Sequence, residues 1–85
     1  MDTMEAIVEG VREVRDELLR IGEVETAQKF SKSLKSFWTT GSEFLVALLD
    51  LFESTQSVWR GRFDETHLMR TEEIVASARE LLGFS

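Results

Sequence analysis

The sequence predicts an all-α fold: one compact antiparallel bundle of four helices, in a single domain that covers residues 1–85. Three observations predict it. The chain contains no proline, the strongest helix breaker. Its apolar residues recur every three or four positions, which is helical spacing, rather than in the alternation typical of strands. Glycines at residues 22, 41 and 61 lie next to helix-capping signals.

The same pattern also fits a second architecture, a long helical hairpin that dimerises. In this alternative Gly22 only kinks the first arm and the second arm absorbs Gly61. The helical spacing of apolar residues continues across both glycines with only small shifts in register. Both architectures therefore stay open at this point.

The first helix is expected over residues 3–21. Asp2 can cap its start, with Glu5 three residues later as the partner in a capping box. Gly22 is placed to end it in the left-handed conformation. One apolar stripe runs along it, made by Met4, Ile7, Val11, Val14, Leu18 and Ile21.

The second helix is expected over residues 23–39, with three lysines on its polar side. Gly41 follows its last periodic residue, and Ser42 is a good N-cap for the next helix. The stretch between them is therefore interpreted as a helix–helix corner. Trp38 and Phe44 are expected to clamp this corner by packing across it, and the alternative is an exposed Trp38 that recognises a partner.

The third helix is expected to start at residue 43 and to end near Gly61. It is apolar nearly all round, so it should be the central element. For the last helix Asp64 and Thr71 are both candidate N-caps, and Gly83 should stop it.

The composition excludes several classes of function. A net charge of −6 argues against nucleic-acid binding, because phosphate neutralisation needs a basic surplus. The absence of cysteine excludes disulfides and thiolate metal sites, and one histidine is too few for a structural zinc site, so no metal or cofactor is expected. The sequence has no secretory signal and no stretch long enough to span a membrane, so we expect a soluble, cytoplasmic protein.

A chain this short has a small core, which is usually reinforced by disulfides, a metal or a partner chain. Elimination of the first two leaves self-association, for which a two-fold homodimer is the commonest form, with a well-packed monomer as the alternative. The third helix has more apolar surface than one small core needs. We therefore expect a homodimer.

No set of residues suited to catalysis is evident, so we do not expect an enzyme. Acidic residues repeat at four-residue spacing on one stripe of the first helix, which is expected to be exposed and therefore unsuited to catalysis. The stripe consists of Glu5, Glu9, Glu13 and Glu17. Its last three members are expected to face the lysines of the second helix across the antiparallel seam. The expected pairs are Glu17 with Lys29, Glu13 with Lys32 and Glu9 with Lys35.

His67 carries the main alternative. The stretch HLMRT at residues 67–71 resembles the H-box of sensor histidine kinases, which reads H-E-L-R-T-P. The resemblance implies a phosphotransfer domain with His67 as the phosphoacceptor. Leu68 and Glu72 depart from that pattern, which has an acid and a proline at these places.

Two further resemblances concern binding. VRDELLRIGE at residues 14–23 resembles the BH3 peptide of apoptosis regulators, and implies groove anchors at Val14, Leu18 and Ile21. WTTGSEF at residues 38–44 resembles the bend of WXG100 proteins, which are exported helical hairpins, but has one residue more between tryptophan and glycine. Trp59 and Gly61 have the right spacing but lie late in the chain.

The sequence as a whole predicts a small acidic protein–protein interaction module, self-associating and non-catalytic. A protein partner of unspecified identity is expected besides a second copy. Contact with anionic lipid through the basic stretch at residues 29–38 is a lower-ranked hypothesis than protein–protein interaction. The candidate partner-binding residues are Lys29, Lys32, Lys35, Trp38, Trp59 and His67.

Overall fold

The computed structural model describes residues 3–36 and 40–83, and within these ranges it contains five helices and no strand. The prediction of an all-α fold is confirmed, whereas the expected count of four helices is wrong. The helices are α1 (Met4–Arg20), α2 (Val24–Lys35), α3 (Gly41–Ser54), α4 (Gln56–Arg62) and α5 (Glu65–Leu82).

Thr55 produces the additional helix. It divides the expected third helix into α3 and α4 and has φ −106° and ψ 6°. Its hydroxyl donates to the carbonyl of Leu51 at 2.7 Å, a side-chain bond that commonly bends a helix. The freed carbonyl of Phe52 accepts a hydrogen bond from the Trp59 indole at 3.0 Å. The break therefore leaves no buried side-chain donor unsatisfied in the described part of the chain.

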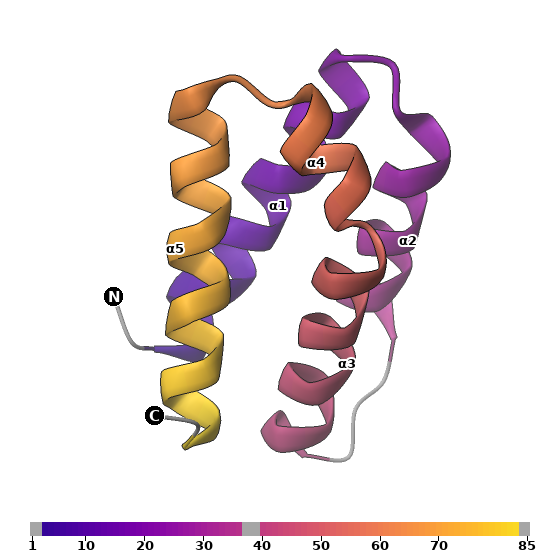
Figure 1. Ribbon diagram of the computed structural model, residues 1–85. Helices are drawn as coiled ribbons and strands as arrows, with labels where there is room; N and C mark the ends of the chain where they lie inside the picture. Colours follow the sequence, from indigo (N-terminus) through magenta and orange to yellow (C-terminus); the bar gives the residue numbers. More distant parts are fainter. Residues whose placement is uncertain (1–2, 37–39, 84–85) are drawn as a thin grey trace.

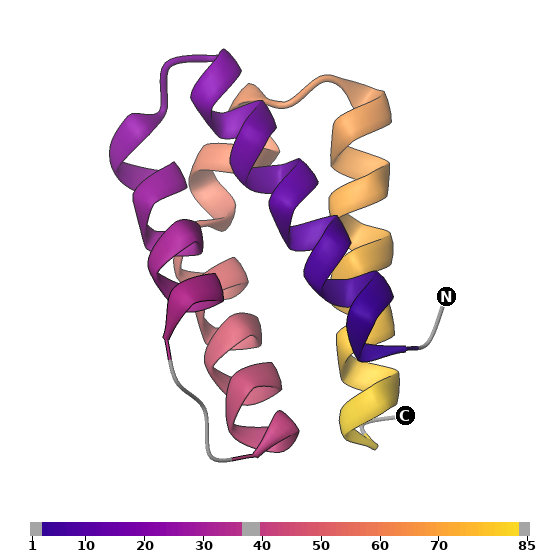
Figure 2. The ribbon, with the colours of Figure 1, turned by 180° about the vertical axis from the view of Figure 1, so that it is seen from behind.

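The four longer helices pack as an antiparallel bundle, and α4 continues α3 at one end of it (Figure 1). Helix α1 packs against α2 and α5, and α3 packs against α2 and α5. The same neighbours lie side by side from behind (Figure 2). The chain reverses between α1 and α2, between α2 and α3, and between α4 and α5, so the long hairpin is not the structure of this protein.

The helix ends follow the expected residue types with some shifts. Gly22 turns the chain with φ +85° and Gly83 ends α5 with φ +92°, as expected. Asp64 caps α5, and its side chain accepts from the backbone of His67. Thr71, the other candidate, lies inside α5.

The other two N-caps differ from the expectation. The cap of α1 is Thr3, whose hydroxyl accepts from Ala6 N, while Asp2 lies outside the described residues. The cap of α3 is Thr40 rather than Ser42.

The core is built from all five helices. Its centre contains a chain of aromatic contacts: Phe30 and Phe52 lie 5.0 Å apart between ring centroids, and Phe52 meets Trp59 edge-on at 6.2 Å. Phe44 is buried as expected. Its expected packing partner, Trp38, lies outside the described residues. The most deeply buried aliphatic side chains are Ile7, Val11, Leu18, Leu48 and Ile74.

Candidate functional site

A polar cluster lies where the C-terminal half of α1 meets the start of α5. It contains Glu17 from α1, Asp64 at the N-cap of α5, and His67 in the first turn of α5. One ligand atom from each residue lies within 4.8 Å of the others. In the chain Glu17 is far from the other two, so only the antiparallel packing of α1 on α5 brings them together.

Glu17 is a buried carboxylate with only 6% of its side chain exposed. Arg20, one helical turn along α1, binds it with two hydrogen bonds of 2.7 and 2.6 Å. These bonds lower the pKa of Glu17 below its ordinary value of 4.5, against the opposing effect of desolvation. The expectation that the whole acidic stripe of α1 is exposed is therefore wrong at Glu17.

Asp64 holds the ring of His67 in place. Its Oδ1 accepts from the His67 backbone at 2.9 Å and lies 2.7 Å from Nδ1 of the imidazole. The first of these bonds, followed by the second, lowers the pKa of Asp64 below 3.8. Because Asp64 is a carboxylate, Nδ1 must carry the proton that it donates.

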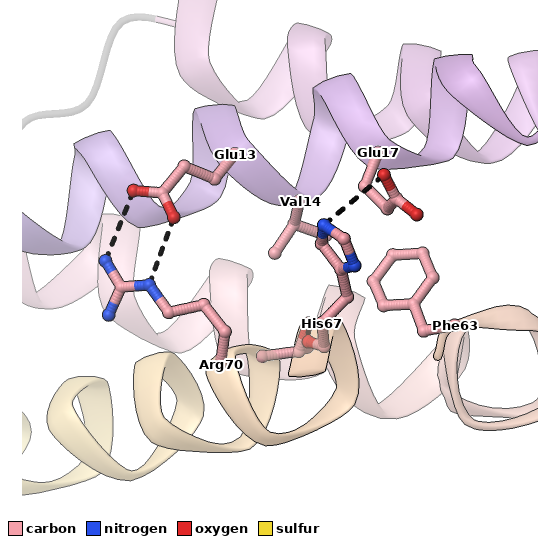
Figure 3. Close-up of a pocket in the computed structure, with 7 residues that line it drawn as sticks. Glu13, Val14, Glu17, Phe63, His67 and Arg70 are labelled. Atoms are coloured by element: carbon pink, nitrogen blue, oxygen red, sulfur yellow. Dashed lines mark hydrogen bonds and ion pairs between the residues drawn. The ribbon is translucent and has the colours of Figure 1, made fainter. Parts of the chain in front are cut away.

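The other ring nitrogen of His67 points at Glu17 (Figure 3). Nε2 lies 3.5 Å from Glu17 Oε1, which also accepts from Arg20. Phe63 meets the ring edge-on at 6.2 Å between centroids. A cavity of about 20 Å³ lies beside this contact, enough for one water-sized group and too small for an organic substrate.

A second ion pair crosses between the same two helices. Arg70 of α5 donates to both carboxylate oxygens of Glu13, at 3.0 and 3.2 Å (Figure 3). It also binds Glu73 on its own helix at 3.0 Å. The acidic stripe of α1 therefore faces α5 over two successive turns, at Glu13 and Glu17.

The predicted pairing of this stripe with the lysines of α2 is wrong. Lys29, Lys32 and Lys35 are exposed, and among the described residues none of them makes an ion pair. Gly22 turns the chain as expected, but Glu13 and Glu17 lie on the flank of α1 that faces α5. The last of the expected partners, Glu9, pairs with Arg12 on α1 instead.

Of the two tryptophans predicted to bind a partner, the structure describes only Trp59. Trp59 is buried, with 3% exposed, and it belongs to the core. Arg60 lies over its ring at 4.8 Å and also binds Glu72 at 3.0 Å. A cavity of about 200 Å³ borders Trp59, between α4 and α5. Trp38 lies outside the described residues.

The residues behind the BH3 resemblance belong to the bundle itself. Val14 and Leu18 are buried with 3% and 0% exposed, so neither is free to act as a groove anchor in the folded chain. The Trp59–Gly61 pair behind the WXG100 resemblance lies inside α4 rather than at a bend between two long helices.

Comparisons with protein-family models, with curated proteins and with solved structures find no match to this chain. The function must therefore be argued from the geometry alone. Sequence reasoning singled out His67 but missed Glu17 as its neighbour and Arg20 as the partner of Glu17. A signal was present for Glu17, since it lies three residues after Val14 and four before Ile21 and so borders the apolar stripe.

Proposed function

We propose that this protein is a non-catalytic protein–protein interaction module that self-associates as a two-fold dimer through the face formed by α2 and α3. The observation that carries the proposal is that the arginines and the lysines differ in how they form ion pairs. Six of the seven arginines make ion pairs within the chain, whereas none of the three lysines does so among the described residues. All three lysines lie on α2.

The neighbouring helix carries opposite charge. Asp50 and Glu53 of α3 are exposed and make no ion pair within the described chain, and Val46, one turn before Asp50, is 46% exposed. Helices α2 and α3 run antiparallel and adjacent (Figures 1 and 2). Two adjacent helices thus carry exposed charges of opposite sign.

A two-fold interface places the same patch of both copies together, so the patch must be complementary to itself. Rotation about an axis between α2 and α3 places α2 of one copy against α3 of the other. Lysines then meet Asp50 and Glu53, and the two Val46 side chains lie near the axis. Opposite charges across such an interface contribute mainly to specificity and association rate.

Other binding partners for the lysines are less well supported. The acidic residues of α3 beside them would repel an anionic lipid surface or a nucleic acid, and the net charge of −6 would add to this. No helix among the described residues is long and apolar enough to cross a membrane.

Phosphotransfer through His67 is also less favoured. Nδ1 is bound to Asp64 and Nε2 faces Glu17, so a phosphoryl group on either nitrogen would lie against a carboxylate. A phosphoryl group carries about two negative charges, so carboxylates beside both ring nitrogens disfavour it.

Sedimentation equilibrium on charge variants tests the proposal. We expect the wild type to be dimeric at micromolar to millimolar concentration and to dissociate as salt is raised. The Lys29→Glu/Lys32→Glu/Lys35→Glu variant should be monomeric, and so should Asp50→Lys/Glu53→Lys. An equimolar mixture of the two should form a heterodimer, because each supplies the charge that the other has lost.

Arg79→Glu is the matched control, because Arg79 is an exposed basic residue of α5 without an ion pair in the described chain. It should leave the dimer intact. A monomeric wild type at millimolar concentration would contradict self-association, and a mass unchanged in both variants would exclude this face.

A further inference from the structure

From the contact between His67 and Glu17 we infer a binding site for one divalent first-row transition-metal ion, of which Zn²⁺ is the prime candidate. In this site His67 Nε2 and Glu17 Oε1 are the protein ligands, and Asp64 orients the histidine. The inference is independent of the proposed function and departs from the sequence-based expectation of no metal.

The first argument is the orientation of the imidazole. Nδ1 gives its proton to Asp64 at 2.7 Å, so in the neutral ring Nε2 carries a lone pair. That lone pair points at Glu17 Oε1, which is also an acceptor, at 3.5 Å. Two acceptors that face each other need a cation between them. A proton on Nε2 would provide one, and so would a metal ion, which would bind both atoms directly.

The second argument is distance. A tetrahedral zinc ion with ligands at about 2.0–2.1 Å holds two of them about 3.4 Å apart. The observed separation of 3.5 Å is longer than a typical hydrogen bond and close to this edge. The adjoining cavity of about 20 Å³ offers space for an ion or for the water that completes its coordination.

The third argument is the surroundings of the histidine. In many zinc sites a carboxylate accepts from the non-ligating nitrogen of the metal-bound imidazole, which fixes its orientation and raises its basicity. Asp64 has this relation to His67. The imidazole ligand favours zinc, copper or nickel over magnesium and calcium, which prefer oxygen ligands only.

Charges around the site leave a small excess of acid. Four carboxylates, those of Glu13, Glu17, Asp64 and Glu73, stand against the guanidinium groups of Arg20 and Arg70. Arg20 is the direct competitor of the metal, because it occupies both oxygens of Glu17. Its removal should therefore strengthen metal binding, which a structural role for the cluster alone does not predict.

The test is titration of the full chain with Zn²⁺. Calorimetry measures the binding, and long-range ¹H–¹⁵N spectra monitor the imidazole during the titration. His67 is the only histidine, so its ring resonances need no assignment. We expect the Nε2 resonance to shift on addition of zinc while Nδ1 keeps its proton. Co²⁺ should give visible absorption bands of a site with nitrogen and oxygen ligands.

Four variants separate the site from chance binding to a surface histidine. His67→Gln should abolish binding and Glu17→Gln should weaken it at least about tenfold. Asp64→Asn keeps the helix cap and should weaken binding about tenfold, because it removes the charged partner of Nδ1. Arg20→Gln should bind more tightly than the wild type. Circular dichroism of each variant verifies that it is folded.

Two results would overturn the inference. One is an Nε2 resonance that does not move at millimolar Zn²⁺. The other is a Glu17→Gln variant that binds zinc as tightly as the wild type, since the ion would then be held by the histidine alone.

Discussion

Gly10 of α1 lies directly against the side chain of Ile74 on α5. A Cβ atom at residue 10 would come within 2.7 Å of Cγ1 and 2.8 Å of Cδ1 of the isoleucine, which is itself fully buried. The absence of a side chain at Gly10 therefore sets how closely α1 and α5 approach. That approach also brings Glu13 and Glu17 within reach of α5.

This contact predicts opposite effects of alanine at two helical glycines. Gly10→Ala should lower the free energy of unfolding by about 1–3 kcal/mol, because Ile74 has to move within a packed core. Gly61→Ala should raise it by up to about 1 kcal/mol, because nothing lies within 4 Å of the new methyl group and alanine favours the helix. Urea denaturation followed by circular dichroism measures both. Equal effects of the two substitutions would contradict the close approach.

The indole of Trp59 should stabilise the break between α3 and α4. Trp59→Phe keeps most of the buried ring but removes the indole donor at 3.0 Å, so the Phe52 carbonyl keeps only the longer contact with the Thr55 hydroxyl at 3.4 Å. We expect a loss of about 1 kcal/mol, the usual net contribution of a hydrogen bond. Thermal unfolding followed at 222 nm measures it. Met69→Leu is the control, since Met69 is an exposed residue of α5, and it should have little effect.

The carboxylates of Glu17 and Asp64 predict how stability depends on pH. Both have a pKa below the ordinary value in the folded chain, Glu17 through Arg20 and Asp64 through His67. Their contribution is therefore present above about pH 4.5, the ordinary glutamate value. It is lost as the pH falls through and below that value, when protonation breaks the bonds to Arg20 and His67.

Urea denaturation from pH 7 to pH 3, in buffer with a chelator, should show this fall in the wild type. The Glu17→Gln/Asp64→Asn variant should be less stable at pH 7 and should lose less of its remaining stability on acidification. Parallel curves for the two proteins would show that other carboxylates account for the acid sensitivity.

The ion pair between Glu13 and Arg70 should couple α1 to α5 only weakly. Both side chains are partly exposed, and such pairs contribute under about 1 kcal/mol. A double-mutant cycle with Glu13→Gln and Arg70→Gln should give a coupling energy of that size, reduced by high salt. Glu9 and Arg12 pair within α1 alone and offer a reference cycle. A coupling energy above about 2 kcal/mol would contradict the prediction of a weak contact between Glu13 and Arg70.

The sequence predicted local features of this protein correctly where one residue determines the geometry. Gly22 and Gly83 adopt positive φ, which glycine permits because it has no Cβ atom, and the Asp64 carboxylate caps α5. The count of helices failed at Thr55, because a threonine inside a continuous apolar pattern gives no sign of a break. The break depends on the Thr55 hydroxyl, which donates to the Leu51 carbonyl, and on the Trp59 indole, which donates to the Phe52 carbonyl.

The candidate site could be predicted only in part. The sequence singled out His67 and, separately, made Asp64 a candidate N-cap three residues before it. It did not reveal Glu17, which belongs to another helix. Nor did it reveal that Lys29, Lys32 and Lys35 make no ion pair in the described chain.

The physical reason lies in what helical periodicity specifies. The spacing of apolar residues determines which stripe of α1 is buried, and the structure confirms Ile7, Val11, Val14 and Leu18 on that stripe. A buried stripe has two flanks, and the spacing is the same whichever neighbouring helix lies along each of them. The tertiary structure placed α5 beside the flank that carries Glu13 and Glu17. The lysines of α2 were thereby left on the surface, and Glu17 was brought to His67.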